Sequence, residues 1–134
     1  MKKVIKILPI VIFVIVFVAV LRKNRLAFLD FYFETSFYKE KYTVVEHRHI
    51  SGRDPSDVYI IKLDDMSKTE TLDTSNYDDG YTHQARELVR IIDSTVTQNM
   101  NVKTKVYKNQ KFGHKLVIVY NVETRYYTVY FITF

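Results

Sequence analysis

The chain of 134 residues carries 20 basic and 15 acidic side chains, a formal net charge of +5, and no cysteine. Without cysteine it cannot form disulfides, a thiol nucleophile or a thiolate metal site. Its 47% hydrophobic content excludes a disordered chain, and its three glycines and two prolines exclude collagen-like and linker-dominated chains.

The first predicted element is an apolar segment at the N-terminus. Residues 7–21 contain no charged side chain, and only Lys6 interrupts an apolar run that begins at Val4. A bilayer core of about 30 Å needs about 20 apolar residues, so we predict a membrane span over about residues 4–21. The span and its basic flanks form an anchor, residues 1–25. A cleaved secretory signal is the alternative, although no A-x-A-like cleavage site follows the run.

The positive charge of the chain belongs to this anchor. Residues 1–25 hold six basic and no acidic side chains, which leaves 14 basic and 15 acidic side chains in residues 26–134. The basicity therefore indicates a membrane lipid bilayer, rather than nucleic acid, as a partner. Basic residues flank both ends of the span, and we favour an extracytoplasmic domain over the alternative of a cytoplasmic one.

Aromatic residues dominate the segment that follows the anchor. Its apolar side chains recur at three- and four-residue spacing: Leu26, Leu29, Phe33 and Phe37. This spacing predicts an aromatic-rich juxtamembrane helix over residues 26–41. Because aromatic residues beside a span commonly lie at the membrane interface, Phe31 and Phe33 are candidates for contact with lipid or a partner.

Residues 42–134 are predicted to form the extracytoplasmic domain. Two segments with strand character, 42–50 and 57–63, flank turn-forming residues and predict a hairpin. In a regular first strand, alternate residues share a face: Tyr42, Val44, Glu46, Arg48 and Ile50 on one side, His47 and His49 on the other.

A polar loop over residues 64–80 and an amphipathic helix over 81–98 are predicted next. Three further strands, 102–108, 114–122 and 126–134, predict an antiparallel meander in which Gly113 is free to adopt positive φ. Because the last two strands carry apolar residues on both of their faces, we expect both faces of the meander centre to be covered. The order β-β-α-β-β-β after a transmembrane helix predicts an α+β domain: about five antiparallel strands packed with one or two helices.

Signals of catalysis and cofactor binding are weak. The sequence contains no G-x-S-x-G elbow, P-loop, dinucleotide fingerprint or H-E-x-x-H motif. His47 and His49 would project from the same strand face, as zinc ligands do, but a third ligand would have to come from elsewhere. We therefore predict no enzyme, cofactor or metal. A secreted or anchored hydrolase, or a metal-binding protein using His47 and His49, is the alternative.

Two surfaces of opposite charge are candidates for contact with a partner. One face of a predicted strand carries Lys103, Lys105 and Tyr107, and Lys111 lies nearby in the loop that follows. The acidic surface is a loop that begins with Asp64 and Asp65. A basic strand with an aromatic side chain can also bind single-stranded nucleic acid. We do not expect a nucleic-acid partner here, because the domain is predicted to be tethered to a membrane and has a net charge of −1. We predict a non-catalytic binding or accessory module of a membrane or cell-surface assembly, whose partner is a protein. A small regulatory membrane protein with a cytoplasmic domain is a further alternative.

Overall fold

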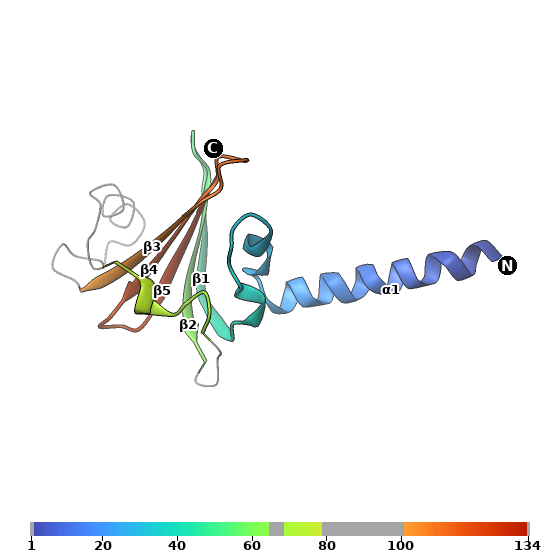
Figure 1. The fold of residues 1–134 in the computed structure, drawn as a ribbon, viewed down its shortest axis with the longest axis horizontal. Helices are drawn as coiled ribbons and strands as arrows, with labels where there is room; N and C mark the ends of the chain where they lie inside the picture. The colour runs from blue at the N-terminus through green and yellow to red at the C-terminus, as the bar shows by residue number, and fades with distance from the viewer. Residues whose placement is uncertain (1, 65–68, 79–100, 134) are drawn as a thin grey trace.

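The computed structural model describes residues 2–64, 69–78 and 101–133. Helix α1 (Lys2–Lys23) leads into a domain built on one antiparallel sheet (Figure 1). The strands are β1 (Tyr42–Ile50), β2 (Ser56–Leu63), β3 (Val102–Lys108), β4 (Lys115–Asn121) and β5 (Tyr127–Ile132). The described residues also contain the 3-10 helices η1 (Ala27–Phe31), η2 (Phe37–Lys39) and η3 (Thr74–Asn76). The prediction of a small α+β-like domain with five antiparallel strands is confirmed, whereas the helix predicted over 81–98 lies outside the described residues.

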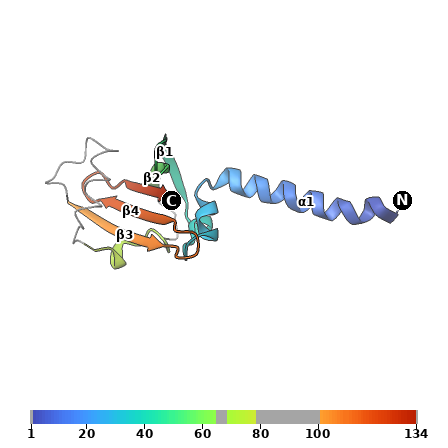
Figure 2. The same cartoon turned by 90° about the horizontal axis from the view of Figure 1, so that it is seen from above.

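The strand order across the sheet is β1-β2-β5-β4-β3, so that β5 lies at its centre (Figure 2). The predicted hairpin of β1 and β2 and the predicted meander of β3, β4 and β5 are both present. The strand ends lie within two residues of the predicted ones. Gly113, in the loop between β3 and β4, has a φ of 70°, as expected for a glycine that closes such a loop.

A β-bulge changes which side chains of β1 share a face. Val44 pairs with Ile61, and Glu46 pairs with Ile60, the adjacent residue of β2. Strand β1 therefore has one extra residue, Val45, between the two pairs. The bulge shifts the alternation by one. As a result Val44 packs against the larger hydrophobic core, and Ile50 packs against the smaller core. The prediction that Val44 and Ile50 share one face is wrong, because it assumed a strand without a bulge.

Buried side chains lie on both faces of the sheet. One face carries the larger core, which joins strand residues such as Ile118 and Val129 to side chains of residues 26–37. The other face carries a smaller cluster: Val58, Val117, Val119 and Tyr130. Every residue of β5 is buried. The prediction that the centre of the meander is covered on both sides is therefore confirmed.

Residues 26–41 form two short 3-10 helices instead of the predicted continuous helix. The Asp30 carboxylate accepts hydrogen bonds from the backbone N–H groups of Phe37 (2.9 Å) and Tyr38 (3.0 Å), and from the Thr35 hydroxyl (2.6 Å). These bonds turn the chain back on itself and replace the partners that a helix would supply. The apolar spacing still serves burial, since Leu26, Leu29, Phe33 and Phe37 all enter the larger core.

Helix α1 extends away from the sheet (Figure 1). Its large apolar side chains between Ile7 and Val18 have exposed fractions of 41% to 70%. Within the part of the chain that the structure describes, no helix has both the length and the apolarity that a membrane crossing requires. The span predicted over residues 4–21 thus stays a prediction.

Candidate partner-binding site

A set of hydrogen bonds fixes the end of α1 to the domain. The Tyr42 hydroxyl accepts a bond from the Leu26 N–H at 2.8 Å and donates one to the Asn24 side-chain oxygen. The Asn24 amide nitrogen donates to the carbonyl of Phe37. On the other side of this junction, the ring of Phe31 packs edge-on against the ring of Phe17 in α1, with centroids 6.3 Å apart. The first turns of the domain are therefore tied to the last turns of α1.

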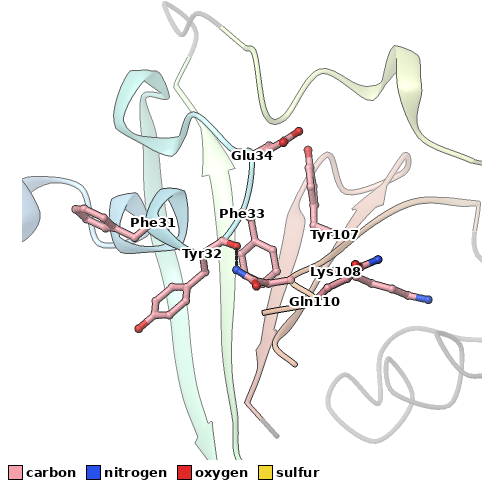
Figure 3. Close-up of a pocket in the computed structure, with 8 residues that line it drawn as sticks. Phe31, Tyr32, Phe33, Glu34, Tyr107, Lys108 and Gln110 are labelled. Atoms are coloured by element: carbon pink, nitrogen blue, oxygen red, sulfur yellow. Dashed lines mark hydrogen bonds between the residues drawn. The ribbon is translucent and has the colours of Figure 1, made fainter. Parts of the chain in front are cut away.

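A hollow of about 410 Å³ lies between residues 31–34 and the end of β3 (Figure 3). Its lining consists of Phe31, Tyr32, Phe33 and Glu34 on one side and Tyr107, Lys108, Asn109 and Gln110 on the other. The Asn109 side-chain amide donates a hydrogen bond to the Tyr32 carbonyl and joins the two walls. Aromatic walls together with one acid and one base suit a mixed polar and apolar ligand, such as a segment of another protein.

The hollow brings together three of the residues predicted to contact a partner. Phe31 is 70% exposed, and its ring is directed toward α1 in Figure 3. Tyr107 is half-buried and lies against Phe33, with ring centroids 6.4 Å apart. Phe33 itself is only 7% exposed. Its side chain is part of the larger core and also lines the hollow, so its selection as a contact residue stays a prediction.

The basic face of β3 lies beside the acidic segment that was predicted as a separate surface. The Lys105 ammonium lies 5.0 Å from the centre of the Tyr107 ring and 5.7 Å from that of Tyr77. Hydrogen bonds from Ser75 lower the pKa of Asp73, and the charge of Lys105 contributes a smaller part. Lys103 is half-buried two residues earlier on β3. Lys105 and Asp73 therefore belong to one mixed surface along this edge.

The remaining candidates lie elsewhere. Lys111 is exposed in the loop between β3 and β4, with its ammonium 5.4 Å from the centre of the Phe112 ring. Asp64 is exposed at the end of β2, where its carboxylate accepts a hydrogen bond from the Thr43 hydroxyl at 3.1 Å. Asp65 lies outside the described residues. The structure thus does not join Lys111 and Asp64 to the hollow.

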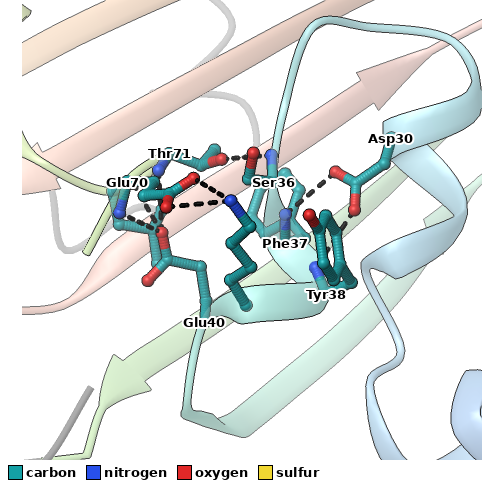
Figure 4. Close-up of polar contacts among 9 residues, drawn as sticks. Asp30, Ser36, Phe37, Tyr38, Glu40, Glu70 and Thr71 are labelled. Carbon is teal, nitrogen blue, oxygen red and sulfur yellow. Dashed lines mark hydrogen bonds and ion pairs between the residues drawn. The ribbon is translucent and has the colours of Figure 1, made fainter. Parts of the chain in front are cut away.

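Glu40 organises a buried contact that sequence reasoning missed (Figure 4). Its side chain is 5% exposed, and its Oε1 accepts hydrogen bonds from the backbone N–H groups of Glu70 (2.7 Å), Thr71 (2.7 Å) and Leu72 (3.3 Å). Burial raises the pKa of Glu40, and the three N–H groups oppose that rise. Lys39 adds an ion pair with Glu70 at 2.9 Å. About thirty residues separate the partners, so no local pattern in the sequence signals this contact.

His47 and His49 share a carboxylate partner on the neighbouring strand. A ring nitrogen of each lies 3.1 Å from the same oxygen of Asp57, and the His47 ring stacks on Tyr59 with centroids 4.3 Å apart. Both imidazoles project from the same face, as predicted. Across the described ranges, no group of three or more histidine, aspartate or glutamate side chains is arranged to hold a metal ion.

Comparison with protein-family models, with curated proteins and with solved structures gave no match. Functional assignment therefore depends on the physical chemistry of the chain itself.

Proposed function

We propose that the protein is a membrane-anchored, non-catalytic binding module that presents an extracytoplasmic α+β domain to a partner protein. The partner docks at the hollow between residues 31–34 and the end of β3 and along the adjacent face of β3. The observation that carries this proposal is the combination of an apolar helix exposed around its length and a firm junction to a folded domain.

The membrane part of the proposal is supported by the exposure of α1. Apolar side chains from Ile7 to Val18 lie open to solvent in the isolated chain. A contiguous apolar surface of this kind is unfavourable in water and marks a site for lipid or protein. The uncharged run of residues 7–21, with basic residues on both sides, favours lipid.

The binding part is supported by the make-up of the hollow and of the face of β3 beside it. Tyr107 and Lys105 lie next to one another on β3, and aromatic side chains beside a cation are common at protein interfaces. Both belong to the set predicted from the sequence to contact a partner. The opposing wall comes directly from the segment that is tied to α1, so the hollow lies near the end of α1.

Co-purification from membranes tests this proposal. The tagged full chain is cross-linked in membranes and compared with a Lys105→Glu variant and a Gln110→Trp variant that obstructs the rim of the hollow. We expect both variants to lose the co-purified protein while remaining in the membrane fraction. The control is Lys62→Glu, which reverses an exposed charge on β2 outside the hollow. Retention of the same partner by Lys105→Glu and Gln110→Trp would exclude this docking surface.

A further inference from the structure

Two exposed aromatic side chains each carry a lysine over their ring. The Lys39 ammonium lies 5.5 Å from the centre of the Tyr38 ring, and Lys111 lies 5.4 Å from that of Phe112. Tyr38 is 61% exposed and Phe112 is 51% exposed. An exposed aromatic ring suits the lipid headgroup region, where a cation beside the ring can meet phosphate. Lys111 offers such a cation, whereas the Lys39 ammonium is already paired with Glu70.

Both pairs lie on the side of the domain from which α1 leaves. Figure 1 shows η2, which contains Tyr38, on the α1 side of the sheet, and the loop between β3 and β4 projecting to the same side near the C-terminus. The Phe112 ring lies 5.9 Å from the ring of Tyr32, the residue that follows Phe31. Phe31, also exposed, meets α1 through Phe17. The three exposed rings belong to segments on the α1 side of the domain and are here called the aromatic face: Phe31, Tyr38 and Phe112.

The charge around the aromatic face favours an anionic surface. Lys39 is neutralised by its ion pair with Glu70. The carboxylate of Asp30 is occupied by backbone N–H groups of the same segment. Besides Lys39, the exposed cations of these segments are Arg25, Lys41 and Lys111, against the carboxylates of Glu34 and Asp30. In the sequence, Arg22 and Lys23 add two more positive charges at the end of α1.

We propose that the aromatic face lies against the anionic lipid headgroups of the bilayer that holds α1. This inference rests on the proposed function, because it needs α1 in the membrane. The junction of Asn24, Leu26 and Tyr42 ties the domain to the anchor, so insertion of α1 brings the aromatic face to the lipid surface. The domain is then oriented on the membrane, with the turn between β4 and β5 directed away from it (Figure 1).

The absence of tryptophan from the chain permits a direct test. Single-tryptophan variants of the full chain, Phe112→Trp and Tyr38→Trp, are reconstituted into vesicles of phosphatidylcholine alone or mixed with phosphatidylglycerol. Brominated lipids then report contact by quenching the fluorescence. Tyr126→Trp, in the turn between β4 and β5, is the matched control. We expect a blue shift and quenching for Phe112→Trp and Tyr38→Trp, stronger in anionic vesicles, and neither effect for Tyr126→Trp.

The charge requirement is tested in the same assay. Adding Lys111→Glu to Phe112→Trp should remove the extra quenching that phosphatidylglycerol produces. If the variants float with the vesicles but Phe112→Trp and Tyr38→Trp are quenched no more than Tyr126→Trp, the aromatic face does not contact lipid and only this inference fails. If no variant floats with vesicles of either composition, the anchor itself fails, and the proposed function fails with it.

Discussion

At the scale of single residues, Glu40 links the stability of the domain to pH. Burial raises the pKa of its carboxyl above the ordinary 4.5, so the folded state binds this proton more tightly than the unfolded state does. The contribution of Glu40 to stability is therefore fully present below the ordinary pKa and is lost as pH rises through the raised one. We expect a Glu40→Gln variant to lack this part of the pH dependence, because an amide does not titrate there.

Denaturant unfolding of the full chain in detergent, followed between about pH 4 and about pH 7, measures this effect. The free energy of unfolding of the unmodified protein should fall relative to that of Glu40→Gln as pH rises. The difference between the two proteins removes the contribution of all other titrating groups. Parallel profiles over the whole range would show that the carboxyl is not desolvated as the structure indicates.

A second residue, Asp30, replaces a helix with a turn. Its carboxylate accepts hydrogen bonds from two backbone N–H groups and one hydroxyl. An Asp30→Ala variant leaves these donors without their partner, and we expect a loss of about 1–3 kcal/mol in the free energy of unfolding. The control, Glu34→Ala, removes an exposed carboxylate nearby and should change the value by less than about 0.5 kcal/mol. Equal effects of the two substitutions in denaturant unfolding would contradict the role given to Asp30.

These two acids also show where prediction from the sequence stops at this scale. Asp30 lies only five to eight residues from its partners. Aspartate is a local turn-forming residue, but the helical spacing of the apolar residues around it hid this signal. Glu40 binds residues thirty positions away, and only the folded chain brings them together. Among the predicted contact residues, periodicity could not separate exposed Phe31 from buried Phe33, because both lie in the same aromatic run.

At the scale of elements, the strands were predictable because alternation and turn residues are local signals. In the sheet order β1-β2-β5-β4-β3, β2 pairs with β5 although β3 and β4 lie between them in the sequence. The alternation of apolar residues does not specify which strands become neighbours. The bulge in β1 was also hidden, since Val45 is as apolar as Val44 yet is exposed. Its effect is large, because one inserted residue reverses the faces of all that follow.

The central position of β5 gives a prediction for the whole strand. It pairs with β2 on one side and β4 on the other, and its side chains are buried on both faces. A chain ending at Arg125 would leave β2 and β4 each without one of their two neighbouring strands and would open both cores. We expect it to lack cooperative unfolding and amide protection in hydrogen exchange. Val129→Ala, which removes two methyl groups from the larger core, should instead stay folded and cooperative with reduced stability. A cooperative transition in the truncated chain would contradict this sheet.

At the scale of the whole molecule, the charge of the sequence has a simple geometric counterpart. The six basic residues of the first 25 accompany α1, whereas the nearly neutral remainder folds into the domain. The two ends of that domain differ in character. One end carries α1 and the aromatic face, and the other carries the turn between β4 and β5 (Figure 1). Such polarity is what the proposed orientation on a membrane requires, and under that proposal the side of the membrane that the domain occupies is the decisive question.

Protease access in intact cells answers that question. With a short cytoplasmic tail and an extracytoplasmic domain, protease added outside intact cells or spheroplasts should reach exposed basic residues of the domain, such as Lys62 and Lys111. We expect loss of a C-terminal tag and retention of a fragment that contains α1, while a cytoplasmic marker protein stays intact. Because basic residues flank the apolar run on both sides, the opposite orientation is the competing outcome. Digestion only after lysis would assign the domain to the cytoplasm and would direct the search for its partner there.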